Sequence, residues 1–438
     1  DNCPDDFPEA QYQDNYKANL AELKNYPFEV RALRAYFHFE LLRRYNRIVI
    51  GDRSFTMQEV NTLVPVSYDD AAGWIVSECD AVIPSLPKTY LGTEKGEVAR
   101  VTKGMAMALK ARMLLYAASP LNNPGGDAAR YLEAAAAAKE LIDAGIYKLV
   151  SEETTNNADA QGLIYGKWCP VSSDFEAANF PVGFEGGNSG VCPSQNLAEA
   201  FDMATGEPFD WNDESMRSRM FVASARDPRF ARTLIYNGAT FKGQSVQSYV
   251  GGRNGRPLDG ATPTSYYLRK HIVEATSFVT GSEMSYQHIF PFFRYAEVLL
   301  NYAEALAAAT QNPDFTGMKG EVEYTLSPRE ALNAVRARYN MPGITETDYA
   351  AFVKRLRNER RVELAFEGHR FWDIRRWKIG AETTKVYGLT ITPQNDGSFS
   401  YVRSVIQQRG WDDRMNYYPI ADAELFKNHN LVQNDGWK

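Results

Sequence analysis

The sequence has few cysteines, no long apolar run and no excess of positive charge, and each shortage excludes a class of protein. Its four cysteines, Cys3, Cys79, Cys169 and Cys192, form no CxxC pair and have no histidine partner at zinc-site spacing. No apolar segment approaches the roughly 18 to 20 residues that a transmembrane helix needs. The formal net charge of −7 argues against a general nucleic-acid-binding protein, which normally presents a basic surface.

Recognised motifs of catalysis and cofactor binding are also missing. The histidines stand singly, and neither GxSxG nor HExxH occurs. Two glycine-rich segments, residues 183–190 and 251–257, match neither pattern of a phosphate-binding loop, although such loops let the backbone approach a ligand. The sequence therefore predicts no catalytic residue, no metal ion and no cofactor.

Helical patterns fill both ends of the chain. The apolar spacing predicts helices over about 19–47, 69–85, 102–118 and 127–144, with Thr102 as an N-cap, Pro120 as a stop and Gly145 as a C-cap. Further helices are expected from Phe293, Ser327 and Thr347. The alanine-rich helix pair over 102–144 resembles a tetratricopeptide unit, in which small and large side chains alternate across stacked helices.

The middle of the chain, about 150–289, is rich in glycine, serine, asparagine and aromatic residues, which predicts loops and short strands with one helix over 194–203. We therefore expect a mostly α fold, an α–α superhelical scaffold of tetratricopeptide-like pairs carrying a loop-rich insert. The predicted parts are a helical region 1–150, an insert 151–290 that holds the ligand site, and C-terminal helices over 291–438, together forming one compact unit.

The segment "RNERRVELAFEGHRFWDIRRW", residues 357–377, holds six arginines and four carboxylates. On a single helix, Arg360, Glu367 and Phe371 fall in one apolar stripe with Glu363 at its edge, and charges in such a stripe must be paired. Arg360 and Glu363 are the expected pair. Glu363 and Glu367 beside His369 suggest an acid–base couple, but the surrounding arginines should lower the pKa of both carboxyls, the wrong direction for a general acid. We therefore interpret the segment as structural.

The longer stretch "LRNERRVELAFEGHRFWDIRRWK", residues 356–378, resembles the signature of the SusD/RagB family of outer-membrane nutrient-binding lipoproteins. Other family landmarks follow in order: "EVRALRAYFHFELLRRY" from Glu29, "VTKGMAMALKARMLLYAASP" from Val101, "SQNLAEAFDMATGEP" from Ser194, "RDPRF" from Arg226 and "FPFFRYAEVLLNYAEAL" from Phe290. Within this signature, the resemblance assigns a structural role to Arg360, Glu363, Glu367, Arg370 and Asp373.

The resemblance implies a non-catalytic protein that binds oligo- or polysaccharides at the cell surface and delivers them to a SusC-like TonB-dependent transporter in the outer membrane. Such proteins carry an N-terminal lipid anchor. Here the first helix comes early and Cys3 does not look like a lipidated cysteine, so we expect the anchor and part of the N-terminal region to lie outside this chain. A peptide-binding, RagB-like function is the alternative within the family.

By position, the family's ligand-binding region corresponds to about residues 165–188. Within it we expect Trp168, Phe180 and Phe184 to stack on sugar rings, and Asp174 and Asn188 to bind hydroxyl groups. Two alternatives come from other classes of protein: a helical glycoside hydrolase using Asp174 and Glu185, and a protein-interaction scaffold without a small ligand. Whether Cys169 and Cys192 form a disulfide stays open at this point.

Overall fold

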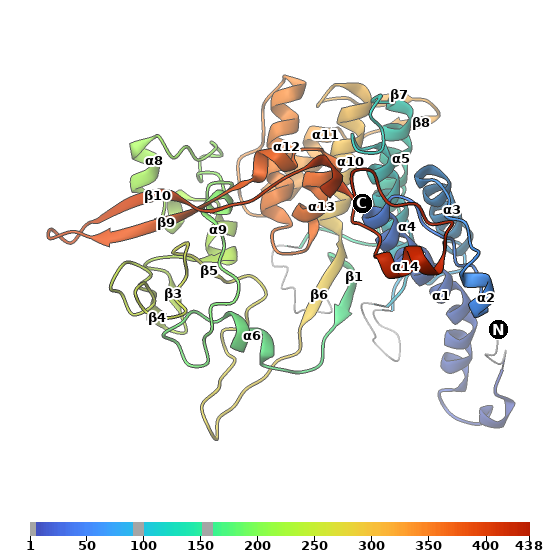
Figure 1. Cartoon of the computed structure of the whole chain (residues 1–438), viewed down its shortest axis with the longest axis horizontal. Coiled ribbons are helices and arrows are strands. Elements are labelled where there is room, and N and C mark those ends of the chain that lie inside the picture. Colours follow the sequence, from blue (N-terminus) through green and yellow to red (C-terminus); the bar gives the residue numbers. More distant parts are fainter. Residues whose placement is uncertain (1–5, 91–99, 151–160) are drawn as a thin grey trace.

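The computed structural model describes residues 6–90, 100–150 and 161–438 (Figure 1). Helices come first: α1 (Tyr16–Tyr45), α2 (Met57–Val60), α3 (Tyr68–Val82), α4 (Lys103–Ala118) and α5 (Ala128–Asp143). They return as α10 (Tyr295–Thr310), α11 (Pro328–Ala337), α12 (Tyr349–Glu363), α13 (His369–Arg376) and α14 (Asp422–Lys427). Single 3-10 turns lie at Pro8–Ala10, Ala223–Ala225, Gly380–Thr383 and Asp413–Asn416.

Successive long helices pack in pairs, α1 on α3, α3 on α4, α4 on α5 and α5 on α10, which also contacts α11 and α12. The Thr102 side chain caps α4 by accepting a hydrogen bond from the Met105 amide, and Gly145 follows α5 with a φ of +61°, where glycine is favoured. Four buried alanines, Ala134, Ala135, Ala137 and Ala138, let α5 approach its neighbours closely. The prediction of a mostly helical fold built on helix pairs is confirmed.

The insert consists of short elements, most of them around a second hydrophobic core. They are β1 (Leu163–Trp168), α6 (Asp174–Asn179), α7 (Gln195–Ala198), α8 (Glu214–Ser218), α9 (Pro228–Thr233), β2 (Leu234–Ile235), β3 (Thr240–Phe241), β4 (Gln244–Ser245), β5 (Tyr267–Leu268) and β6 (Ile289–Arg294). Of these, β1 and β6 pack against the helical core through Ile164 and Phe293. The strands form antiparallel pairs, β1 with β6, β2 with β5 and β3 with β4, as do β7 (Gly317–Lys319) and β8 (Val322–Tyr324) among the later helices.

The helix predicted over 194–203 ends after one turn, at Ala198. A buried guanidinium explains the early end, because Arg226 donates hydrogen bonds to the carbonyl oxygens of Ala198 at 2.7 Å and Phe201 at 2.9 Å. These carbonyls are thereby bonded to a side chain instead of to the amides of a continuing helix. Phe201 is fully buried in the second core, so a helical continuation would have to move it.

A long antiparallel hairpin, β9 (Lys385–Pro393) and β10 (Phe399–Gln408), was not predicted. Figure 1 shows it reaching from the C-terminal helices across the insert. Leu389 and Ile391 are buried in the second core, so the hairpin fastens the insert to the C-terminal part of the chain. The hairpin corrects the expectation that the region after residue 291 contributes helices alone.

The arginine-rich segment forms two helices instead of one. After α12 the chain turns through Phe366 and Gly368, with φ angles of +62° and +80°, before α13 begins. The turn separates side chains that one helix would align, and Phe371 lies on the surface. The expected Arg360–Glu363 pair is wrong: Arg360 instead donates to both carboxylate oxygens of Asp373, at 3.0 and 2.9 Å.

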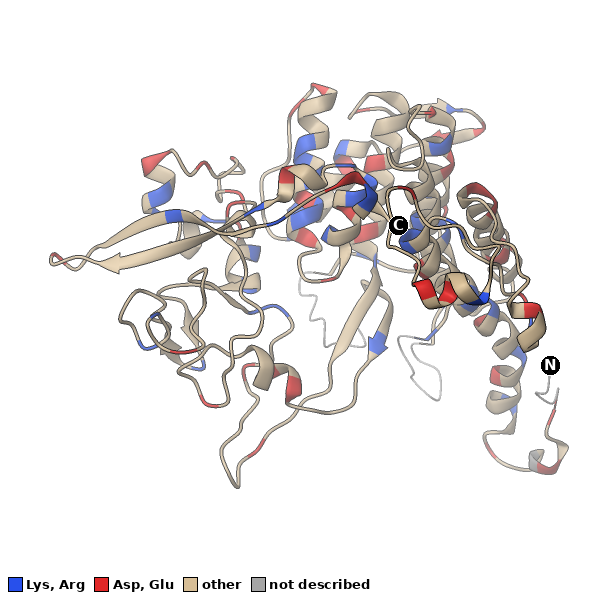
Figure 2. Ribbon diagram, in the orientation of Figure 1, with Lys and Arg blue, Asp and Glu red and all other residues tan. Residues whose placement is uncertain are grey.

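This pairing ties α12 and α13 to α10. Arg360 also donates to the Asn301 side chain at 2.6 Å, and Arg376 bonds both Asp373 and Glu304. Arg360, Asp373 and Arg376 are buried. In Figure 2, residues of both charges gather along α12 and α13, whereas the insert and the hairpin carry few charged residues.

Replacing Arg360 with methionine should destabilise the fold by about 3 kcal/mol or more, because it leaves Asp373 buried with one cation fewer and Asn301 without its donor. The measurement is the midpoint of urea unfolding. Arg53→Met is the matched control, since Arg53 pairs with Glu59 at an exposed site and such pairs contribute about 1 kcal/mol or less. Equal losses in the two variants would contradict a structural role for Arg360.

Candidate functional site

An aromatic pocket of about 440 Å³ lies where α6 meets β6 and the segment after β5. Three phenylalanines and two histidines contribute rings to its wall. It is lined by Cys169, Pro170, Ser172, Asp174, Phe175, Val191, Leu268, His271, His288, Ile289, Phe290 and Phe366. Such a wall, mostly apolar with a few polar groups, is typical of a small-molecule site.

Helix α6 is held against this pocket by its own buried carboxylate. Glu176 accepts hydrogen bonds from the Val273 amide at 2.9 Å and from His288 Nε2 at 3.2 Å. The Phe175 ring lies between the two histidines, with centroid distances of 5.5 Å to His288 and 6.5 Å to His271. The rings are therefore held by contacts on several sides.

Burial, reinforced by the neighbouring Lys270, lowers the pKa of His271 to about 4. At neutral pH its imidazole is uncharged. The ring lies 5.9 Å from that of Phe290. A neutral imidazole has both a hydrogen-bond donor and an acceptor, which suits a ligand rich in hydroxyl groups.

Trp168 stands beside this pocket at the end of β1. It is paired across the sheet with Ile289, and its chain neighbour is Cys169; both of these line the pocket. The Trp168 side chain is 45% exposed. A large aromatic surface is thus available next to an aromatic cavity.

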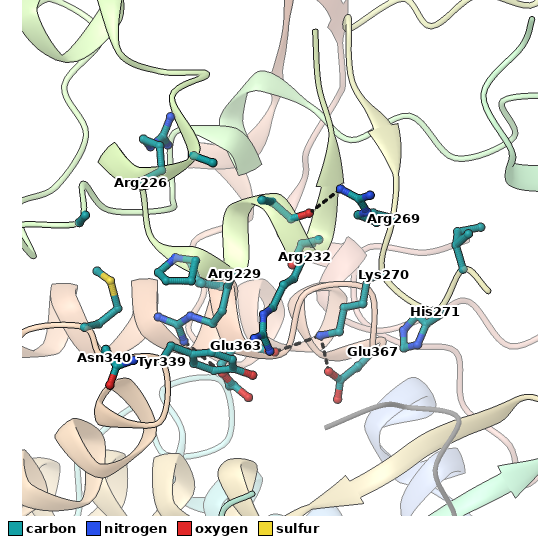
Figure 3. A pocket seen from close by; sticks show the side chains of 18 of the residues that line it. Arg226, Arg229, Arg232, Arg269, Lys270, His271, Tyr339, Asn340, Glu363 and Glu367 are labelled. Atoms are coloured by element: carbon teal, nitrogen blue, oxygen red, sulfur yellow. Dashed lines mark hydrogen bonds and ion pairs between the residues drawn. The ribbon is translucent and has the colours of Figure 1, made fainter. Parts of the chain in front are cut away.

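A second, larger pocket of about 840 Å³ lies between α9, the segment after β5 and α12 (Figure 3). We call it the arginine-lined pocket. Arg226, Arg229, Arg232, Arg269, Lys270 and Arg294 line it, with Glu274, Glu363 and Glu367 as its carboxylates and Tyr339 and Asn340 at one side. His271 lines both pockets, so the two are adjacent.

The acidic floor of the arginine-lined pocket is strongly paired. Glu363 forms ion pairs with Arg229, Arg294 and Arg338, and Glu367 with Lys270 and Arg294. Burial alone would raise the pKa of both carboxyls, but these cations outweigh it. The pKa of Glu363 falls well below its usual range, and that of Glu367 falls to about 2.

The predicted lowering of both pKa values is thus confirmed, and neither carboxyl is suited to act as a general acid. The nearby His369 is buried and has a strongly lowered pKa, through burial and then through Arg112 and Arg360. Among the described residues, no group of three or more histidine, cysteine, aspartate or glutamate side chains is placed to hold a metal ion.

The five residues predicted to bind the ligand do not all gather at one place. Asp174 lines the aromatic pocket and Trp168 stands beside it. Asn188 is exposed and donates a hydrogen bond to the carbonyl of Ala177 in α6. The half-buried Phe184 packs edge-on against Phe241 in the second core.

Phe180 needs a correction. Its side chain is 0% exposed and packs edge-on against Phe241 and Phe278, with centroids 5.1 and 5.8 Å apart. The ring is part of the second core, and no face of it is open to stack on a sugar. The sequence shows an aromatic residue among polar neighbours but not which way the side chain turns.

The two glycine-rich segments contact each other. A Cβ on Gly183 would lie 2.3 Å from the carbonyl oxygen of Arg253, and the buried Asn254 donates a hydrogen bond to Val182 at 2.7 Å. Glycine is needed there because two backbones approach closely. The same region contains Cys169 and Cys192, both of which are free thiols.

A model of the SusD family matches residues 151–437. The chain belongs to the SusD family. The resemblance inferred from the signature at 356–378 is therefore confirmed. That signature lies in the part of this SusD-family chain where α12 and α13 join α10 to the insert.

Two solved SusD-like structures from Bacteroides fragilis resemble the whole chain. One is 27% identical, has a TM-score of 0.78, and covers 95% of this chain and 80% of its own. The other, a SusD-like carbohydrate-binding protein, is 26% identical and has a TM-score of 0.76. The match covers 94% of this chain and 80% of that protein. SusD-like protein P2 of Formosa agariphila is 33% identical over 146 residues, which span 32% of this chain and 24% of that relative.

The arginine-lined pocket was missed at the level of sequence. Its lining comes from α9, residues 269–274, residues 339–341 and α12, which are far apart along the chain. The one available signal was the spacing of Arg226, Arg229 and Arg232, which recur every three residues in a short segment. Arg229 and Arg232 both reach the Tyr339 ring, with guanidinium carbons 5.1 and 5.4 Å from its centroid.

Replacing Glu367 with glutamine should lower the free energy of unfolding at pH 7, and should lower it by less at acidic pH. Because the folded pKa is depressed to about 2, the ionised carboxylate stabilises the fold above its unfolded pKa near 4.5, by about 3 kcal/mol. This contribution is lost as the pH falls from about 4.5 towards 2. Urea unfolding at pH 7 and pH 3 should therefore show a gap between parent and variant that narrows at pH 3.

Glu424→Gln is the control, because Glu424 is exposed in α14 and pairs with the equally exposed Lys427. It should change stability little at either pH. A gap for Glu367→Gln that is the same at both pH values would show that the variant acts through packing and not through the carboxylate's ionisation.

Proposed function

We propose that this SusD-family chain binds oligo- or polysaccharides at the aromatic pocket and Trp168, without catalysing their breakdown. The exposed indole beside an aromatic cavity is the observation that carries the proposal. An aromatic face packs on the apolar C–H face of a pyranose, while nearby polar groups bond its hydroxyls.

The pocket offers polar groups of the right kind. Asp174 accepts hydrogen bonds, and His271 adds an uncharged imidazole to the wall, with its Nε2 directed at the Phe366 carbonyl. The cavity of about 440 Å³ is of the size that encloses a small ligand or one or two sugar units of a longer chain. Stacking on Trp168 would extend the contact to a sugar outside the cavity.

The positions of Asp174 and Glu185 support a hydrolase function less well than they support glycan binding. Asp174 lines the aromatic pocket, whereas Glu185 lies in the exposed turn after Phe184. Glycoside hydrolysis needs two carboxyl groups flanking one bond. In the arginine-lined pocket, Glu363 and Glu367 are held ionised by their cations, which leaves them no proton to donate.

The wider setting follows from the family. We propose that the chain works at the surface of the outer membrane, attached through a lipid anchor, and passes its glycan to a SusC-like TonB-dependent transporter. Among the described residues, no helix combines the length and the apolar character that spanning a bilayer requires. A solved relative described as carbohydrate-binding supports the choice of glycan over peptide.

Native gels containing single polysaccharides test the proposal. The parent chain should be slowed by at least one glycan, and Trp168→Ala should weaken that binding about tenfold or more, as truncating a tryptophan at a binding hot spot commonly does. Phe426→Ala is the matched control, because Phe426 is 77% exposed on α14, away from the pocket.

Absence of retardation across a broad panel would overturn the glycan proposal. Binding of short peptides by the same protein, weakened by Trp168→Ala, would instead favour the RagB-like function. New reducing ends released from a bound polysaccharide would show catalysis and contradict the non-enzymatic part of the proposal.

A further inference from the structure

The charges of the arginine-lined pocket do not balance. Six cationic side chains line it against three carboxylates. Asp227 and Glu359, which lie behind Arg229, add two more carboxylates to the network. An excess of positive charge remains in a cavity that is large enough for a sugar unit.

The excess can be assigned to particular residues. Arg229, Arg294 and Lys270 are paired with the floor carboxylates, and Arg269 is paired with Glu274 at 2.6 Å. Arg226 has no carboxylate partner among the described residues, but it donates to three backbone carbonyls, and Figure 3 shows its guanidinium directed away from the floor.

Arg232 is different. It is exposed, and it makes no hydrogen bond or ion pair within the described parts of the chain. Its guanidinium carbon lies 5.4 Å from the centroid of the Tyr339 ring. Figure 3 shows Arg232 reaching from α9 into the space between Tyr339 and Lys270. A guanidinium with five unused N–H donors therefore points into the pocket.

Two neutral groups at one side of the pocket are also unused. Neither the Tyr339 hydroxyl nor the Asn340 side-chain amide bonds to another described residue. Burial and the nearby Glu363 raise the pKa of Tyr339 to about 12, so the hydroxyl stays protonated at neutral pH and can donate. A cation and two neutral hydrogen-bonding groups that line one pocket suit an anionic group on a ligand that also carries hydroxyls.

We propose that the glycan is acidic, and that the arginine-lined pocket holds one of its carboxylate or sulfate groups against Arg232. This inference rests on the proposed glycan-binding function, since it names the class of glycan. The wall shared through His271 puts this anion site next to the aromatic pocket, where a neighbouring sugar ring would pack.

The ion pairs on the floor of the pocket indicate that the ligand places one anionic substituent there. Every carboxylate of the floor already has its cations, so a ligand cation would find no free partner there. A second anion would have to compete with Glu363 or Glu367 for a guanidinium that is buried against it. Arg232 alone can form a bidentate pair with a carboxylate or sulfate without breaking an existing bond.

The experiment measures binding in affinity gels to acidic and neutral polysaccharides and to chemically neutralised forms of each acidic one. Polygalacturonate is compared with its methyl ester, and carrageenan with its desulfated form, which separates carboxylate from sulfate recognition. Binding should be confined to acidic polymers, be lost on neutralisation, and weaken as salt is raised.

Substitutions of Arg232 test whether the acidic group binds in the arginine-lined pocket. Arg232→Gln should weaken binding of the acidic polymer about 10- to 100-fold, the loss common for a hydrogen bond to a charged group. Arg232→Lys keeps the charge but not the bidentate geometry, and should keep part of the affinity. Arg409→Gln is the control, because Arg409 is an exposed arginine that follows β10 and does not line the pocket.

The outcomes separate this inference from the proposed function. Binding of a neutral polysaccharide that Trp168→Ala weakens and Arg232→Gln leaves unchanged would overturn the acidic-glycan inference and keep glycan binding. Binding of an acidic polymer that is unaffected by Arg232→Gln would overturn the assigned pocket. Failure to bind any polysaccharide would overturn the proposed function, and the inference with it.

Discussion

The buried ion pairs around α12 and α13 are the interaction on which the rest of the structure depends. Removing charged groups from water costs several kcal/mol each, and that cost is offset only where every charge finds a partner of opposite sign. Here the partners come from different parts of the chain: Asn301 and Glu304 from α10, Arg229 from α9 and Arg294 from the end of β6. One set of pairs ties α12 and α13 to α10, and a second set ties α12 to α9 and β6, so a shift of the scaffold or the insert against α12 would leave a buried charge unpaired.

Both pockets depend on these ion pairs for their shape. Lys270 bonds to Glu367 and to the carbonyl of Glu363, which holds the segment after β5 against the turn between α12 and α13. The next residue, His271, is thereby fixed in the wall between the two pockets, close to the carbonyl of Phe366. The side chains that face the ligand lie on short elements and loops, but the buried ion pairs beneath them hold these segments in place. A loop-rich surface can in this way present a defined site.

The helices could be predicted because their signals are local. Thr102 and Gly145 mark ends that the backbone chemistry of a few residues decides. The pairing of Arg360 could not be predicted, since the turn at Phe366 and Gly368 brings Asp373 to it in place of Glu363. The hairpin did carry a signal, an "NDG" turn between alternating β-branched residues, which the helical pattern around it obscured. The direction of the Phe180 ring and the gathering of arginines in one pocket are set by tertiary packing, which no short segment encodes.

Net charge and local charge lead to different conclusions about ligands. A chain with a formal charge of −7 repels polyanions at long range. At physiological ionic strength this repulsion is screened beyond about 8 Å, so a ligand in contact with the surface responds mainly to the groups beside it. In the arginine-lined pocket, the paired cations and carboxylates largely cancel, and the unpaired Arg232 determines the local field. The overall negative charge thus disfavours broad, sequence-independent binding of a polyanion such as nucleic acid, while one guanidinium in a shaped cavity still suits a single acidic group on a sugar.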